Sequence, residues 1–143
     1  MLFVLVYLMY DFHRPQAIHK SYISTIYSYE SQFEQQTVVS IEGKLYKNLF
    51  GKDIFLGEMI ADEDMKYELK LKEEGNYYSQ TLTVQGKDRV HSTMGSIRIS
   101  LQFDKLWIQL NDINEKYSIT EGYISGPARN MEEAKDIARR LAE

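Results

Sequence analysis

The chain has 143 residues and a net charge of −4, with 43% hydrophobic and 27% charged residues. This balance is typical of a single globular domain and excludes a mainly disordered chain, a collagen-like chain and a multi-span membrane protein. Cysteine is absent, which excludes disulfides, thiol catalysis and cysteine-based zinc sites. Basic residues form no block, so we expect no binding to nucleic acid.

The first ten residues, MLFVLVYLMY, are all apolar or aromatic. A helix that spans a bilayer needs about 20 such residues, and no basic residue precedes the run as in a signal peptide. Three interpretations are open: the end of a truncated membrane anchor, a buried β-strand, or a core helix. The anchor predicts membrane contact through residues 1–12.

Residues 16–32 are polar with apolar residues interspersed. Ile18, Tyr22, Ile26 and Tyr29 recur at roughly helical spacing. We therefore expect a helix or stalk here, and we divide the chain into an anchor-like and stalk segment, 1–32, and a β-rich domain, 33–143.

From residue 33 to 126 apolar and polar residues alternate, which indicates strands with one buried face. Single glycines inside these runs, Gly43, Gly57 and Gly95, are expected to mark bends. The pattern predicts a mainly β (α+β) fold, an antiparallel meander of about seven strands that forms a curved sheet, a sandwich or a small barrel. The predicted strands lie near 36–47, 53–61, 65–72, 77–85, 94–103, 104–111 and 118–125.

The last segment predicts a helix over 131–142. Pro127 ends the preceding strand, Asn130 is a suitable N-cap, and Glu133 follows it at the spacing of a capping box. One side of this helix carries an apolar stripe, formed by Met131, Ala134, Ile137, Ala138 and Leu141. We expect this helix to pack on the sheet or to close its open end.

Sites for catalysis or metal binding are not expected. His13, His19 and His91 show no metal-ligand spacing. The acidic run 62–64 lacks the glycine of an EF-hand loop and is expected to be a charged hairpin turn. No nucleophile-elbow or phosphate-loop sequence is present. The chain is therefore predicted to have no catalytic, cofactor-binding or metal-binding residues and not to be an enzyme.

Aromatic residues stand out, with 11 tyrosines and a single tryptophan. Trp107 is out of phase with the apolar residues around it, and Tyr46, Tyr77 and Tyr123 also lie off the main apolar phase or at the ends of runs. Two alternatives are open for these four residues. They form a binding face for a ligand, peptide or sugar, or they form a second core layer under the N-terminal segment or the helix.

Several stretches between residues 33 and 143 are typical of a known family: 41–50 (IEGKLYKNLF), 55–58 (FLGE), 95–97 (GSI), 124–128 (ISGPA) and the start of the helix at Asn130, Glu132, Glu133 and Ala134. On these residues the chain resembles uncharacterised small proteins of Bacillus-type bacteria that have an N-terminal membrane anchor and an extracytoplasmic β-rich domain. The resemblance implies no catalytic motif.

These observations predict a non-enzymatic, membrane-tethered or envelope-associated small domain that binds a protein or a small ligand. The alternative is a soluble cytoplasmic ligand-binding or regulatory domain, with residues 1–10 buried in its core.

Overall fold

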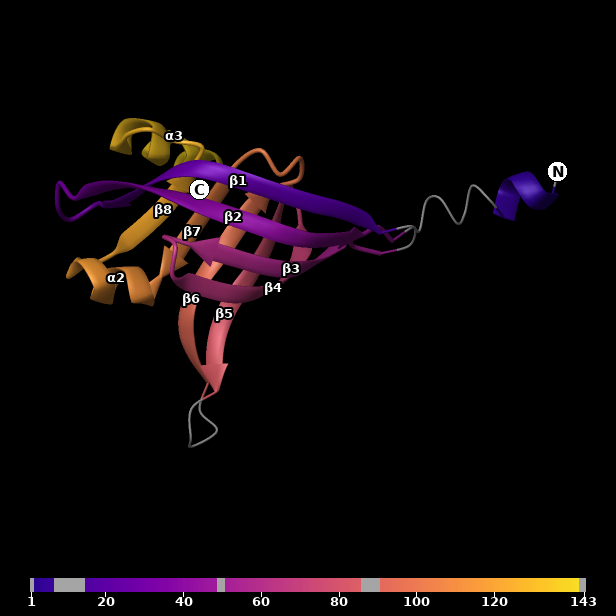
Figure 1. Cartoon of the computed structure of the whole chain (residues 1–143), viewed down its shortest axis with the longest axis horizontal. Coiled ribbons are helices and arrows are strands. Elements are labelled where there is room, and N and C mark those ends of the chain that lie inside the picture. Colours follow the sequence, from indigo (N-terminus) through magenta and orange to yellow (C-terminus); the bar gives the residue numbers. More distant parts are fainter. Residues whose placement is uncertain (1, 7–14, 49–50, 86–90, 142–143) are drawn as a thin grey trace.

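The structure is a computed structural model that describes residues 2–6, 15–48, 51–85 and 91–141. Eight strands and two helices follow the N-terminal segment (Figure 1). The elements, in chain order, are β1 (Gln16–Ser28), β2 (Glu34–Tyr46), β3 (Ile54–Ala61), β4 (Met65–Glu74), β5 (Tyr77–Gln85), β6 (His91–Ser100), β7 (Leu106–Leu110), α2 (Asn111–Tyr117), β8 (Gly122–Gly126) and α3 (Met131–Leu141).

The strands form a closed antiparallel barrel in which each strand pairs with the next along the chain. β1 closes the barrel because it pairs with β8, with Thr25 opposite Ser125. The predicted mainly β, antiparallel fold is confirmed, and the small barrel is the form that it takes. The meander has eight strands, one more than expected.

The additional strand is β1, so the helix or stalk predicted for residues 16–32 is wrong. The C-terminal half of β1 is buried on both faces, with Ile26 facing the barrel interior and Tyr27 covered from outside. A strand buried on both faces loses the apolar–polar alternation and produces apolar residues at mixed spacings. Ile18, Tyr22 and Ile26, which fall at helical spacing, all belong to the interior core.

The barrel interior is filled by apolar side chains. Phe55, Met59 and Leu71 are fully buried, as are Ile97 and Ile99. The Tyr22 hydroxyl donates a hydrogen bond to the backbone carbonyl of Phe103 at 2.6 Å. This contact ties β1 to the β6–β7 turn and satisfies a hydroxyl buried within the core.

Facing glycines allow the wall to curve at β2 and β3. Gly43 lies directly opposite Gly57, and a Cβ atom on Gly43 would lie 2.3 Å from the carbonyl oxygen of Leu56. A Cβ on Gly95 would lie 1.8 Å from the carbonyl oxygen of Gln109. Only glycine permits such close approaches of backbone to backbone.

The C-terminal helix is confirmed. The Asn130 side chain accepts a hydrogen bond from the Glu133 amide at 2.9 Å, and the Glu133 carboxylate accepts one from the Arg129 amide at 2.9 Å. α3 lies on the outside of the barrel against β8, β1 and β7. It therefore packs on part of the wall and does not close an end of the barrel.

Helix α2 was not expected. It begins at Asn111, the last residue of the strand predicted over 104–111, and its Ile113 side chain is fully buried. The chain leaves α2 through Ser118 in the left-handed region, with a φ of 53°. Because α2 occupies this stretch, β8 starts at Gly122 rather than near residue 118.

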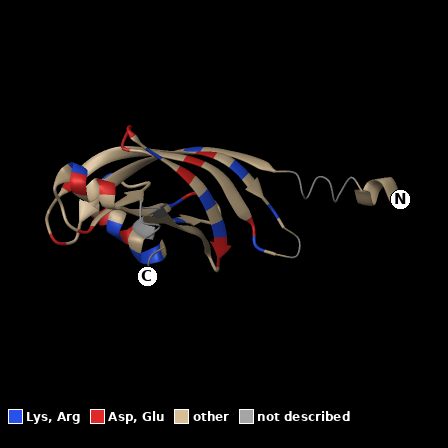
Figure 2. Cartoon of the chain, turned by 90° about the horizontal axis from the view of Figure 1, so that it is seen from below, with Lys and Arg blue, Asp and Glu red and all other residues tan. Residues whose placement is uncertain are grey.

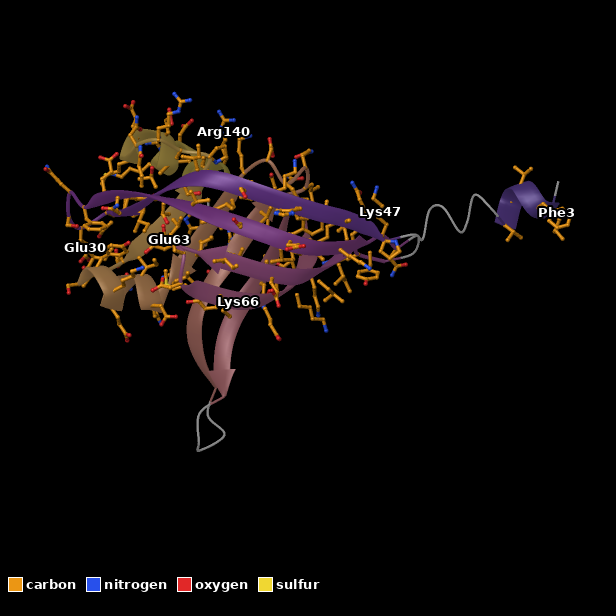
Figure 3. All side chains as sticks on the ribbon, viewed as in Figure 1. Phe3, Glu30, Lys47, Glu63, Lys66 and Arg140 are labelled. Atoms are coloured by element: carbon orange, nitrogen blue, oxygen red, sulfur yellow. The ribbon has the colours of Figure 1, made fainter. Side chains whose placement is uncertain are left out.

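Residues 2–6 form a short helix whose side chains are exposed. The exposed fractions are 74% for Leu2, 87% for Phe3, 61% for Val4, 60% for Leu5 and 61% for Val6. Phe3 lies apart from the barrel (Figure 3). For these residues the prediction of a strand or helix buried in the core is wrong; the remainder of the apolar run, 1 and 7–10, lies outside the described residues. In the described part of the chain, no helix is long and apolar enough to cross a membrane.

Candidate functional site

Three of the four predicted aromatic residues meet on the outer wall of the barrel. Trp107 stacks on Tyr123 with ring centroids 5.6 Å apart, and Tyr123 lies 5.8 Å from Tyr27. Tyr77 packs at the margin of the same cluster. α3 covers the cluster through Ala134, Ile137, Ala138 and Leu141, and Trp107 is only 9% exposed.

Arg98 joins these aromatic rings to the end of the helix. Its guanidinium lies 4.8 Å from the ring centroid of Tyr77 and 5.7 Å from that of Trp107. The same guanidinium donates a hydrogen bond to the carbonyl of Leu141 at 2.8 Å. A cation at this position compensates the negative end of the helix dipole. The geometry is that of a second core layer under α3, and the predicted role of these residues in binding stays a prediction.

Tyr46 does not join the other three. It is the last residue of β2, opposite Ile54, and is 40% exposed.

The structure adds Tyr27, which the sequence did not single out, to the aromatic cluster under α3. Tyr27 is fully buried beneath the helix, and its hydroxyl lies 3.1 Å from Ser125 Oγ. Because residues 16–32 were predicted to be a helix or stalk, the position of Tyr27 on the outer face of a strand could not be recognised.

A polar junction ties α2 to the turn between β3 and β4. The Asp62 carboxylate accepts hydrogen bonds from Thr37 Oγ1 at 2.7 Å and from the Tyr117 hydroxyl at 2.5 Å. Lys116 Nζ lies 2.6 Å from Asp62 Oδ2 and 3.0 Å from Asp64 Oδ1. The acidic run is therefore a hairpin turn, as predicted, but Asp62 points inward and is 9% exposed.

The electrostatics of this junction favour ionised Asp62. Burial pushes the pKa of the Asp62 carboxyl upward, but the hydrogen bonds from Lys116, Tyr117 and Thr37 outweigh it and hold the pKa below its usual range. Burial and the bond to Asp62 raise the pKa of Tyr117 to about 12. Thr37, Tyr117 and Lys116 all contact Asp62, so we call this junction the Asp62 clamp, a structural link between α2 and the β3–β4 turn. Among the described residues, no group of three or more His, Asp or Glu side chains could hold a metal ion.

The pairing between β4 and β5 is interrupted, and this interruption leaves a slit in the barrel wall. Only Lys72–Glu74 pair with Tyr77–Ser79, whereas β5 stays paired with β6 as far as Gln85, with a shift in register between Leu82 and Thr83. In Figure 1 the β5–β6 hairpin extends away from the rest of the barrel. The first seven residues of β4, 65–71, therefore have no strand partner on this side within the described part of the chain.

A glutamine side chain bridges the slit. Gln80 Oε1 accepts a hydrogen bond from the Lys70 amide at 2.6 Å, and Gln80 Nε2 donates one to the carbonyl of Glu68 at 3.4 Å. These are the two backbone groups that a paired strand would satisfy. The side-chain amide thus takes the place of a neighbouring peptide unit.

A pocket of about 420 Å³ opens at the slit. Its lining is polar and carries an excess of positive charge. The lining residues are Lys70, Lys72, Glu74, Ser79, Gln80, Thr81, Ser96, Ile97 and Arg98. The sequence shows that Lys70 and Lys72 lie on one face of a strand, but the break in strand pairing that creates the pocket has no local signal.

A second pocket, of about 400 Å³, lies at the barrel end where β1 begins. Its floor includes Tyr78 and Phe103, whose rings pack with centroids 5.2 Å apart. Burial raises the pKa of Tyr78 to about 12, so its phenol is neutral at physiological pH. The remaining lining residues are Gln16, Ile18, Lys20, Leu45, Lys47, Asp53, Glu73, Leu101 and Gln102.

Comparison with protein families, with curated proteins and with solved structures gives no match for this chain. The resemblance described above therefore stays a prediction, and the arguments about function depend on the geometry of the molecule.

Proposed function

We propose that the protein is a non-enzymatic binding domain that its N-terminal apolar segment tethers to a membrane or an envelope surface. The observation that carries the proposal is the exposure of five consecutive apolar side chains at residues 2–6, each at least 60% accessible. Contiguous exposed apolar surface of this kind typically marks a contact with a lipid or a protein. Full burial of one such side chain contributes roughly 1.5 to 3 kcal/mol.

The distribution of charge supports an orientation with the N-terminal end of the barrel toward the surface. Lys20 and Lys47 are exposed near the end at which β1 begins, where Asp53 and Glu73 line the same pocket. Glu30 and Glu63 are exposed at the opposite end (Figure 3). Lysine side chains near an anionic membrane contribute about 1 kcal/mol each. Carboxylates are repelled by the same surface, so the acidic end faces away from it.

Vesicle flotation tests this proposal. The full chain is expected to float with vesicles that contain an anionic phospholipid, and the variant Phe3→Ser/Leu5→Ser is expected to stay in the dense fraction. Val38→Ser is the matched control because Val38 is 48% exposed but lies on the barrel wall; it should float like the unaltered protein. Equal flotation of the unaltered chain and the Phe3→Ser/Leu5→Ser variant contradicts the tether.

A second candidate function is small-ligand binding at the pocket where β1 begins, and the observation that favours it is the pocket's volume and mixed lining. About 400 Å³ lies within the range of ligand sites. A small carboxylate with an aromatic ring, such as benzoate or indole acetate, is a suitable probe, since Lys20 and Lys47 lie beside Tyr78. In an NMR titration, chemical-shift changes confined to the backbone amides of the residues that line this pocket would support small-ligand binding. No change at millimolar probe contradicts it.

A further inference from the structure

We propose that the slit between β4 and β5 binds an extended, acidic peptide segment of a partner protein, which adds a strand to the exposed edge of β4. This inference deepens the proposed binding role and rests on it, but it does not depend on the membrane tether. The observations that carry it are the interrupted pairing, the bridging Gln80 side chain and the positive lining of the pocket.

The edge of β4 at the slit presents backbone groups in the order that a strand requires, and an added strand would replace the two bonds to the Gln80 side chain. The Lys70 amide and the Glu68 carbonyl both point into the slit, as their bonds to Gln80 show. In an antiparallel ladder both backbone groups of a residue face the same side, so the Glu68 amide and the Lys70 carbonyl face the slit as well. By the same alternation, the backbone groups of Lys66 do so too.

The other side of β4 is fully occupied. The residues that alternate with those at the slit face β3: Tyr67 pairs with Met59, Leu69 with Gly57, and Leu71 with Phe55. β4 is therefore held rigidly in the barrel wall while one edge stays open to a partner. Addition of a strand to such an edge is a common mode of peptide recognition, in which backbone hydrogen bonds provide affinity and side chains provide specificity. Unpaired edges also invite this kind of contact.

Charge indicates the type of segment that fits. The outward side chains of Lys70 and Lys72 line the slit, and neither forms an ion pair within 4.0 Å with a carboxylate of the described residues. Glu74 is the one acidic residue in the lining. Figure 2 shows charges of both signs along the strands of the barrel. Acidic side chains on the outward face of an added strand would meet these lysines.

The inner face of the slit is apolar. Leu69 and Leu82 are 3% and 6% exposed, and alternate residues of an added strand would face them. The partner segment is therefore an extended chain in which acidic residues alternate with apolar ones. Hydroxyl groups of Ser79 and Thr81 lie on the β5 side of the pocket and can bind the same carboxylates.

The test uses the full ¹⁵N-labelled chain and a blocked eight-residue peptide in which glutamate alternates with valine. The peptide is expected to shift the amide resonances of Lys66, Glu68 and Lys70 and to slow hydrogen exchange at Glu68. A peptide with lysine in place of every glutamate should bind at least tenfold more weakly. A glutamate–valine peptide whose central valine is proline should also bind at least tenfold more weakly, because proline lacks the amide that an added strand needs.

Charge reversal provides a variant that keeps the fold and changes the preference. Lys70→Glu/Lys72→Glu is expected to bind the lysine–valine peptide in preference to the glutamate–valine peptide. Lys44→Glu is the matched control, since Lys44 is exposed on β2 away from the slit; its preference should stay unchanged. Shifts confined to other parts of the barrel, or equal binding of both peptides by the unaltered chain, overturn the proposal.

A second copy of this chain could also use the edge, and the same experiment separates that outcome. Self-pairing through β4 would appear as a concentration-dependent dimer without added peptide, and it would overturn the proposal of a peptide partner. Vesicle flotation is independent of both results. A chain that floats but ignores the peptide retains the tether and loses the strand site, and a chain that binds the peptide without floating shows the reverse.

Discussion

Replacement of Asp62 by alanine is expected to lower the free energy of unfolding by about 3 kcal/mol. The Asp62 carboxylate accepts bonds from Thr37 at 2.7 Å and Tyr117 at 2.5 Å, and a bond to a charged acceptor contributes roughly 1.5 kcal/mol at the lower end of its range. The Lys116 side chain is 36% exposed, so water and salt screen its ion pair and it adds little to this loss. For a chain of this length the loss corresponds to a fall in Tm of roughly 10 °C.

Urea denaturation followed by Trp107 fluorescence measures this loss, because Trp107 is buried under α3. Asp64→Ala is the matched control: the Asp64 side chain is 68% exposed and also contacts Lys116. It should change the free energy of unfolding by less than about 0.5 kcal/mol. A loss for Asp62→Ala no larger than that for Asp64→Ala refutes the assignment of Asp62 as the centre of the clamp.

The same variant gives a prediction for acid pH. The pKa of Asp62 is lowered in the folded protein, so its stabilising contribution is present above the unfolded value of about 3.9. That contribution is lost as the pH falls through the folded pKa. The difference in unfolding free energy between the unaltered chain and Asp62→Ala should therefore shrink as the pH falls below about 3.9. An equal difference at neutral and acid pH contradicts the role of an ionised carboxylate.

Three further substitutions test the packing. Gly43→Ala should cost about 2 to 4 kcal/mol, because the added Cβ would meet the Leu56 carbonyl; thermal denaturation measures this, and an unchanged Tm would contradict the tight approach. Glu63→Gly should stabilise the protein by about 1 kcal/mol, since Glu63 has a φ of 69°; a lower midpoint in urea would argue against relief of strain. Ala134→Asp should cost about 3 kcal/mol or more by burying a charge under α3, whereas Glu132→Asp should have little effect on the same urea curve.

Much of the fold could be predicted from local pattern, because β2, β3 and β4 each alternate between a buried face and a more exposed one. β1 could not, since α3 covers its outer face at Tyr27 while Ile26 faces the core. α2 was equally hidden: its sequence begins like a turn, and its Ile113 is buried only because the barrel end requires a cover. Both errors arise where tertiary burial, rather than local propensity, decides the conformation.

The candidate sites also differ in whether local pattern could predict them or whether they depend on tertiary contacts. The aromatic residues Tyr77, Trp107 and Tyr123 were recognisable from their phase, and their position under α3 was one of the two predicted alternatives. The slit at Gln80 was not recognisable, because a break in pairing depends on how far β5 follows β6 away from β4. Strand register is a property of two distant segments, and alternation within each segment cannot show where they separate.

The most direct test of the central claim, that the exposed residues 2–6 tether the barrel to a membrane, measures the surroundings of Phe3. The chain has no cysteine, so Phe3→Cys can be labelled at a single position with an environment-sensitive fluorophore. Addition of anionic vesicles is predicted to shift its emission to the blue and increase its intensity, whereas the same label at Ser31→Cys, in the exposed turn after β1, should be unaffected. Emission from position 3 that does not change with vesicles would contradict the tether.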